Sequence, residues 1–291
     1  MQEQARGRPC FDRQKNEGVW KARKDGIAAA SGEYIGFADP DDYVEKDFAA
    51  RLYRTAKEND ADIACCGFYR KDEDTGRVYS IEMTHFRAAS FDFKKDPGLL
   101  PQVNTALWNK IFRAGLLKGM GDSNLVPKVL DDLIFANLIY INARSFAFVR
   151  DPLVHYTVRK DSINSSLKPE YVPGVYASMK ELRKIYRRDD PELLPYLDAE
   201  AFLHLGVSLM HRLSLNRQID RTALSENRAV LNKSFPLWQR NPYIKLSYVI
   251  RHRGANLRLY IVHSIYRLRL FCLFLKVYRT MIERFGIDIK W

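Results

Sequence analysis

Three carboxylates stand within four residues at Asp39-Pro40-Asp41-Asp42. Like charges this close repel one another, so the cluster costs stability unless a cation lies among it. Carboxylate oxygens are hard ligands that suit Mg²⁺ or Mn²⁺, and Asp39 and Asp41 could present two of them to one point. The alternative is a solvated turn in which Asp42 caps the following helix. The cluster alone leaves both interpretations open.

The acidic cluster directly follows a short apolar run, 34–38, that has the character of a strand. Because proline cannot continue a paired central strand, the cluster is predicted to form a turn at the strand's carboxyl end. Ligands of open α/β sheets bind beyond the carboxyl ends of the strands. The spacing therefore places the carboxylates where a ligand is expected.

The chain up to residue 168 reads as alternating helices and strands, which indicates an α/β fold with crossovers. The pattern predicts helices at 16–30, 45–59, 104–118 and 127–143, strands at 34–38, 61–69, 78–84 and 145–150, and a polar loop at 151–166. From residue 169 onward the pattern is helical and is interrupted by prolines. We therefore expect an α/β domain over 1–168 and a helical region over 169–291.

Positive charge is concentrated near the C-terminus. The formal net charge is +12, and residues 237–291 contain eleven Lys or Arg against two acidic residues. Read as one helix, residues 257–285 place large apolar side chains on most of the surface and these charged ones on one face: Arg258, Arg269, Lys276, Arg279 and Glu283. Such a helix suits an anionic membrane surface, or it packs on the protein's own core. Nucleic acid is not expected as a partner, because the basic residues alternate with aliphatic ones.

The composition is that of an ordinary folded protein, with 46% apolar and 28% charged residues. Four scattered cysteines predict neither a disulfide framework nor a zinc site, which favours a reducing compartment. The polar first residues predict no secretory signal, and no long window free of charge predicts a membrane span. We therefore expect a cytoplasmic protein, peripheral at the inner face of the plasma membrane.

The segment 16–42 resembles the bacterial family 2 glycosyltransferases of the inverting GT-A type. The resemblance rests on the pattern N-x-G-x-x-x-A-R-x-x-G-x-x-x-A-S-G-E-Y-I-G-F-x-D-x-D-D. It continues in the family's order through LWNKIFR at 107–113, LDDLIF at 130–135 and YTVRKDS at 156–162. In total it covers roughly residues 16–165, and it implies a nucleotide-sugar donor and a glycan or polyprenyl-linked acceptor.

On the donor side, the resemblance implies that Asp39 and Asp41 hold a divalent cation that bridges the donor's diphosphate. The leaving nucleoside diphosphate gains negative charge in the transition state, and a cation there stabilises it selectively. Arg23 matches an arginine that faces the same diphosphate. Arg159 and Ser162 match a loop that closes over it with a guanidinium fork and a hydroxyl donor.

On the acceptor side, the resemblance implies that Asp132 is the general base, which takes the proton of the acceptor hydroxyl. Asp131 stands where the family more often has Glu, so the base is left open between the two. Without the family, the pair reads as first-turn carboxylates of the helix at 127–143, where they favour the dipole. Lys110 and Trp108 match the acceptor side, although a core role suits Trp108 equally well.

The family normally begins with strands that bind the nucleotide, and residues 1–15 contain nothing similar. We therefore expect a partial GT-A mixed sheet that lacks its first strands and has an exposed edge. The function expected from the resemblance is sugar transfer with inversion in bacterial cell-surface polysaccharide synthesis. A chain truncated in this way is expected to transfer sugar poorly or not at all. The alternative is an inactive, glycosyltransferase-like binding protein on the membrane surface.

Overall fold

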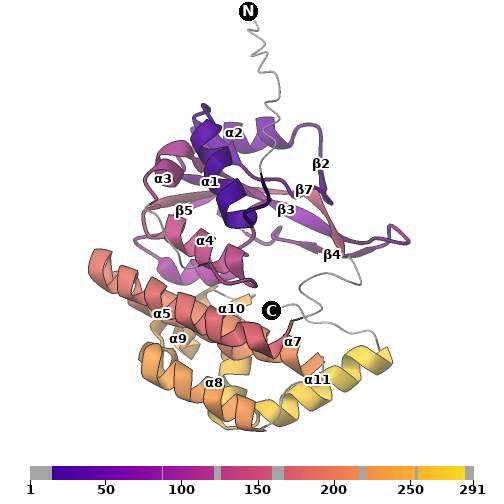
Figure 1. The fold of residues 1–291 in the computed structure, drawn as a ribbon, viewed down its shortest axis with the longest axis vertical. Coiled ribbons are helices and arrows are strands. Elements are labelled where there is room, and N and C mark those ends of the chain that lie inside the picture. Colours follow the sequence, from indigo (N-terminus) through magenta and orange to yellow (C-terminus); the bar gives the residue numbers. More distant parts are fainter. Residues whose placement is uncertain are drawn as a thin grey trace, which may run out of the picture.

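The computed structural model describes residues 15–86, 88–120, 126–158, 167–215, 221–252 and 255–285. Two regions follow one another in the chain. A sheet with helices on it comes first, and a group of helices lies against it (Figure 1). Helices α1 and α2 of the first region lie at the opposite end of the molecule from helices α8 and α11 of the second (Figure 1).

The first region alternates short helices with strands. In chain order these are α1 (Val19–Ala29), β1 (Tyr34–Gly36), β2 (Tyr43–Val44), α2 (Phe48–Glu58), β3 (Ile63–Asp72), β4 (Val78–Glu82), β5 (Ser90–Asp92), the 3-10 helix η1 (Pro97–Gln102), β6 (Lys110–Arg113), α3 (Ala114–Lys118), α4 (Asp131–Tyr140) and β7 (Ser145–Val158). The helices predicted at 16–30 and 45–59 are confirmed, as are the strands predicted at 34–38, 61–69 and 78–84.

The described strands form one mixed sheet. Its order is β1-β6-β3-β7-β2, with β4 paired to β3 and β5 paired to β7. The two longest strands, β3 and β7, run parallel, whereas the other pairs are antiparallel. A parallel pair needs a crossover, and here α3 and α4 lie in the chain between the two strands. The predicted α/β class with a mixed sheet is therefore confirmed, and β1 lies at an edge of the described sheet.

Three sequence-based boundaries are wrong. The segment 104–118 was predicted to be one helix, but it contains β6 followed by the short α3. Strand β6 is sandwiched between β1 and β3, and this pairing on both sides overrides the helical periodicity. The predicted loop at 151–166 is also wrong over its first half, because β7 continues to Val158 alongside β3. Helix α4 begins only at Asp131, after Leu130 in the left-handed region at φ 58°.

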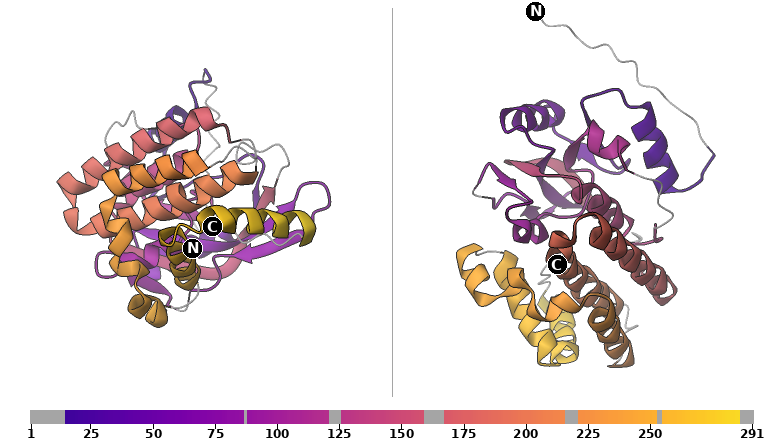
Figure 2. Two further views of the ribbon diagram at one scale, coloured as in Figure 1. Left: turned by 90° about the horizontal axis from the view of Figure 1, so that it is seen from below. Right: turned by 90° about the vertical axis from the view of Figure 1, so that its left-hand side faces the viewer.

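The second region is helical, as predicted. Its elements are η2 (Pro169–Tyr171), α5 (Val172–Asp189), η3 (Pro191–Leu193), α6 (Leu194–Ala201), the π-helix η4 (Phe202–Leu209), α7 (Met210–Leu215), α8 (Arg221–Ser234), η5 (Pro236–Arg240), η6 (Pro242–Ile244), α9 (Leu246–His252), α10 (Ala255–Arg267) and α11 (Phe271–Phe285). Seen from below, these helices cover the sheet (Figure 2). The division into separate domains at residue 168 stays a prediction.

A buried amide on α4 joins the two regions. Asn137 accepts a hydrogen bond from the hydroxyl of Tyr196 on its Oδ1 (2.6 Å) and one from the hydroxyl of Tyr186 on its backbone oxygen (2.8 Å). These tyrosines lie on α6 and α5, and all three side chains are fully buried. Because unpaired polar groups in a core are costly, the hydrogen bonds fix the orientation of α4 on the helical region.

The C-terminal segment forms two helices, so the single helix predicted over 257–285 is wrong. Arg269 has a φ of 61°, and the backbone N–H groups of Arg269 and Leu270 donate to the carbonyls of Tyr266 and Ile265, both at 3.1 Å. This is the Schellman arrangement that ends a helix, with arginine where glycine is more usual. Within the described residues, each helix falls short of the length and apolarity that a membrane-crossing segment needs.

Candidate functional site

The acidic turn follows β1, where the sequence predicted it. Asp39, Asp41 and Asp42 are partly buried, and each offers a carboxylate oxygen that lies within 4.8 Å of the others. The turn is closed by a hydrogen bond from the backbone N–H of Asp42 to the carbonyl of Asp39 (3.2 Å). The three side chains therefore converge as a cation site would require.

Strand β7 holds this turn in place through Thr157. The backbone N–H of Thr157 donates to Oδ1 of Asp42 (2.8 Å), and its hydroxyl donates to the carbonyl of Asp41 (2.9 Å). The interpretation of Asp42 as a helix cap is therefore wrong, because α2 begins at Phe48, well after it. Thr157 could not be identified as a site residue from the sequence, because it falls in the segment predicted to be a polar loop.

We expect Thr157→Val to weaken Mn²⁺ binding by about three- to tenfold, since groups that orient metal ligands affect affinity nearly as strongly as the ligands do. The variant loses the hydroxyl bond to Asp41 and keeps the shape of the side chain. Isothermal titration with Mn²⁺ alone measures the effect. Thr157→Ser keeps the hydroxyl and serves as the matched control. Equal Mn²⁺ affinities for the valine and serine variants would contradict the role given to the hydroxyl.

Arg23 connects α1 to the start of α4. One guanidinium nitrogen donates to Oδ2 of Asp131 (2.8 Å) and the other to Oδ1 of Asp132 (2.5 Å). The Arg23 side chain is only 13% exposed and lies 5.4 Å from the centre of the Phe135 ring. Phe135 in turn makes edge contacts with Trp20 of α1. The Phe135 ring therefore packs against the Arg23 guanidinium. This contact could not be predicted from the sequence.

The carboxylates of the turn and those of α4 are electrostatic neighbours. Burial, together with the charges of Asp131 and Asp39, raises the pKa of Asp132 to about 6, and the Arg23 guanidinium works in the opposite direction. Burial also raises the pKa of Asp39, again opposed by Arg23 and reinforced by Asp41 and Asp131. The arrangement thus brings together the predicted cation ligands, the predicted base and Arg23, which lie on three separate elements.

The donor set of the turn suits a divalent cation. Three carboxylates supply hard oxygen atoms, and because burial raises the pKa of Asp39, a positive partner beside it would favour its charged form. Asp39 and Asp41 would hold the ion, because one oxygen of Asp42 is already engaged by Thr157. Arg23 is directed to Asp131 and Asp132 in this structure, so its predicted contact with the diphosphate stays a prediction.

The two residues predicted on the acceptor side are buried. Trp108 is 8% exposed and stacks on Tyr156, with ring centres 5.2 Å apart. Lys110 is fully buried, where burial lowers its pKa to about 8, and its ammonium group donates hydrogen bonds to Asn104, Asn109 and the carbonyl of Ala106. An acceptor could reach Lys110 only after a rearrangement. Direct contact with an acceptor stays a prediction for both side chains.

The remaining predicted donor ligands, Arg159 and Ser162, lie outside the described residues. The Nε2 atom of His155 lies 2.6 Å from the carboxylate of Glu45. Its ring is stacked between those of Tyr43 and Tyr69, at 4.1 and 4.8 Å between centres. These contacts favour a structural role for His155.

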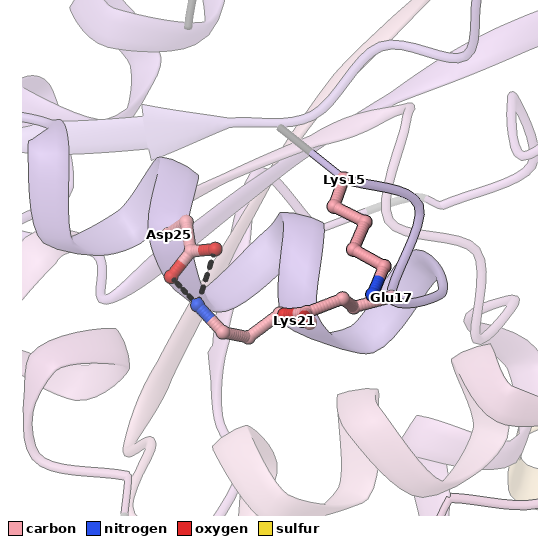
Figure 3. A pocket seen from close by; sticks show the side chains of 4 residues that line it. All are labelled: Lys15, Glu17, Lys21 and Asp25. Atoms are coloured by element: carbon pink, nitrogen blue, oxygen red, sulfur yellow. Dashed lines mark hydrogen bonds and ion pairs between the residues drawn. The ribbon is translucent and has the colours of Figure 1, made fainter. Parts of the chain in front are cut away.

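Two surface hollows lie on the first region of the described structure. One, of about 520 Å³, runs between β1 and α2, has a largely apolar lining that includes Phe37 and Phe48, and reaches Ala38, the residue before Asp39. The other, of about 340 Å³, lies along α1, where the ammonium group of Lys21 contacts both carboxylate oxygens of Asp25 (Figure 3). Because these two charges satisfy one another on the surface, the second hollow is not a candidate site.

Comparisons with known proteins point to one family. Residues 3–116 match the family described as Glycosyl transferase family 2. The chain is 27% identical over 213 residues to the putative glycosyltransferase EpsH of Bacillus subtilis, which covers 68% of this chain and 59% of that protein. It is 28% identical over 180 residues to the poly(ribitol-phosphate) beta-glucosyltransferase of Bacillus spizizenii, covering 58% of this chain and 26% of that protein.

The fold has a counterpart among solved structures. The crystal structure of Staphylococcus aureus TarS residues 1–349 in complex with UDP-GlcNAc superposes with a TM-score of 0.57, at 18% sequence identity, over 93% of this chain and 73% of that chain. This likeness shows the GT-A type of fold. The chain spans less than two thirds of the length of the curated relatives given above.

Proposed function

Because residues 3–116 match glycosyltransferase family 2, we propose that this chain is a member of that family and transfers a sugar from a nucleotide-sugar donor to a glycan or lipid-linked acceptor, with inversion at the anomeric carbon. The observation that carries the proposal is the meeting of Asp39 and Asp41, Arg23 and Asp132 at one place in the fold. A relative that acts on poly(ribitol phosphate) supports a role in cell-surface polymer synthesis.

In this proposal Asp132 takes the proton of the acceptor hydroxyl. The acceptor oxygen then forms a bond to the anomeric carbon while the bond to the diphosphate breaks on the opposite face, so the configuration inverts. A carboxyl whose pKa is raised to about 6 is deprotonated at neutral pH and is still a stronger base than an ordinary aspartate. Asp131, one residue earlier, shares Arg23 with it and helps to orient the guanidinium.

Asp39 and Asp41 would hold a divalent cation, Mg²⁺ or Mn²⁺, next to the site for the donor's diphosphate. When bound, the cation neutralises the charge that develops on the leaving diphosphate. The chain's own contribution is the fixed geometry of the turn, which β7 provides through Thr157. We place the reaction at the inner face of the plasma membrane, where polyprenyl-linked acceptors would be available.

Titration calorimetry with UDP and with UDP-sugars tests donor binding directly. We expect binding that requires Mn²⁺ and that Asp41→Asn weakens by about tenfold or more, because the variant removes a charged ligand of the cation. Asp25→Asn is the matched control, since Asp25 pairs with Lys21 on the surface of α1. A folded protein that binds neither UDP nor any other nucleoside diphosphate with Mn²⁺ would contradict the proposal and favour the inactive binding protein.

A further inference from the structure

Helices α10 and α11 each have two opposite faces. On α10 the inner face buries Leu259, Val262 and Tyr266, and on α11 the inner face buries Phe271, Leu275 and Tyr278. The option in which the C-terminal segment packs on the protein's own core is therefore confirmed for these inner faces. The outer faces also carry exposed aliphatic side chains, whereas the outer face of an ordinary surface helix is polar.

Six aliphatic side chains within 21 residues are 47% to 68% exposed: Leu257, Ile261, Leu268, Leu270, Leu273 and Val277. We call them the outer ridge. At about 100° per residue, Leu257 and Ile261 fall on one side of α10, opposite its buried face. Leu273 and Val277 do the same on α11, and Leu268 and Leu270 flank the turn at Arg269. Scattered exposed leucines are normal, whereas several exposed aliphatic side chains gathered on neighbouring helices mark an interaction surface.

Basic side chains border the outer ridge. Arg258 and Arg267 are exposed on α10 and project to either side of the stripe, and Lys276 is exposed beside it on α11. The sequence from 246 to 282 holds seven Lys or Arg and no acidic residue. Since the border is uniformly positive, the surface is complementary to a negatively charged partner.

We infer that the outer ridge inserts into the headgroup region of a bilayer containing anionic lipids, with Arg258, Arg267 and Lys276 at the phosphate level. Aliphatic groups flanked by basic ones are the combination that such an interface takes up. A second copy of the chain is a poorer occupant, because a symmetric contact would bring two positive borders together. The inserted surface is thus the outer ridge of two helices joined at Arg269, rather than the face of one continuous helix expected from the sequence.

This inference rests on the proposed function only for the choice of membrane, and its test needs neither donor nor acceptor. The full chain is mixed with vesicles of phosphatidylcholine containing 30% phosphatidylglycerol, and the bound fraction is measured by sedimentation. We expect Ile261→Ser/Leu273→Ser/Val277→Ser to lower the partition coefficient by about tenfold or more. The three side chains are 49%, 60% and 53% exposed, so the substitutions leave the core intact.

The chain offers a matched control at other exposed positions. Val19→Ser/Val78→Ser/Ile81→Ser changes side chains that are 50%, 42% and 52% exposed on α1 and β4, and it should bind vesicles as the wild type does. A third variant, Arg258→Gln/Arg267→Gln/Lys276→Gln, should weaken binding to the anionic vesicles and reduce its dependence on salt, with little effect on vesicles of pure phosphatidylcholine.

The outcomes separate the possible occupants. Absence of wild-type binding to anionic vesicles, or equal binding by the ridge and control variants, would overturn the inference. So would wild-type dimers in analytical ultracentrifugation that the ridge variant dissociates, because a second copy would then occupy the ridge. Vesicle binding without any nucleotide binding would leave this inference standing and refute the proposed sugar transfer, whereas the reverse result would refute the inference alone.

Discussion

Asp132→Asn is expected to lower kcat for sugar transfer by about 10³-fold, within the range usually lost with a general base. The amide keeps the size of the side chain and can still lie beside Arg23, but it cannot take the acceptor's proton. Because Asp132 is not one of the proposed cation ligands, Mn²⁺-dependent UDP binding should change by less than about threefold. Initial rates with radiolabelled donor, set against calorimetry on the same preparation, measure the two quantities separately.

Asp131→Asn is the matched control, because it also removes one charge and one hydrogen bond to Arg23. It should retain most of the activity if Asp132 alone is the base. A larger loss in the Asp131 variant than in the Asp132 variant would exchange the two roles. In the wild type, kcat should fall as the pH is lowered through about 6, since the base works only when it is deprotonated. That acidic limb should disappear in Asp132→Asn.

The sequence predicted the individual parts of the site better than their connections. The acidic turn was placed correctly because an apolar run followed by Asp-Pro is a local signal, and its position after β1 follows from that signal. The bridge from Arg23 to Asp131 and Asp132 joins residues more than a hundred positions apart. Periodicity and turn chemistry say nothing about such a contact, since it depends on how α1 and α4 pack.

The boundaries that failed share a physical cause. The segment that became β6 has helical spacing of its apolar residues, but two neighbouring strands supply hydrogen bonds that outweigh this preference. Strand β7 was cut short at Arg150 in the prediction because the next residues are Asp151 and Pro152, which usually end a strand. In the structure the β3–β7 register shifts at this point and the strand continues, which brings Thr157 to the acidic turn.

The buried and exposed faces of the C-terminal helices also could not be predicted from the sequence. Composition indicated a basic and apolar segment, and that much is present. Which face points outward depends on where the helix is interrupted, and Arg269 carries no sequence signal for a left-handed turn. A helical projection through that residue therefore mixed side chains from two differently oriented helices, and the buried and exposed faces could be assigned only from the structure.

Arg23→Gln is expected to have the second-largest effect, a loss of about 10²-fold in kcat near pH 6.5. The guanidinium lowers the pKa of Asp132 against the effect of burial, so its removal raises that pKa above about 6. A larger fraction of the base is then protonated near neutral pH, and the acidic limb of the pH–rate profile moves to higher pH. At pH 8.5, where Asp132 is deprotonated with or without Arg23, the loss should shrink to about tenfold or less.

Arg23→Lys provides the matched control for charge. An ammonium group keeps the positive charge but lacks the planar fork that now reaches Asp131 and Asp132 together. It should restore the position of the acidic limb in large part while leaving kcat at high pH reduced, because the base is less well oriented. Profiles of kcat recorded from pH 5 to pH 9 at saturating Mn²⁺ and donor separate charge from orientation. If the glutamine variant lost activity equally at every pH, Arg23 would act on the donor alone and the electrostatic link to Asp132 would be refuted.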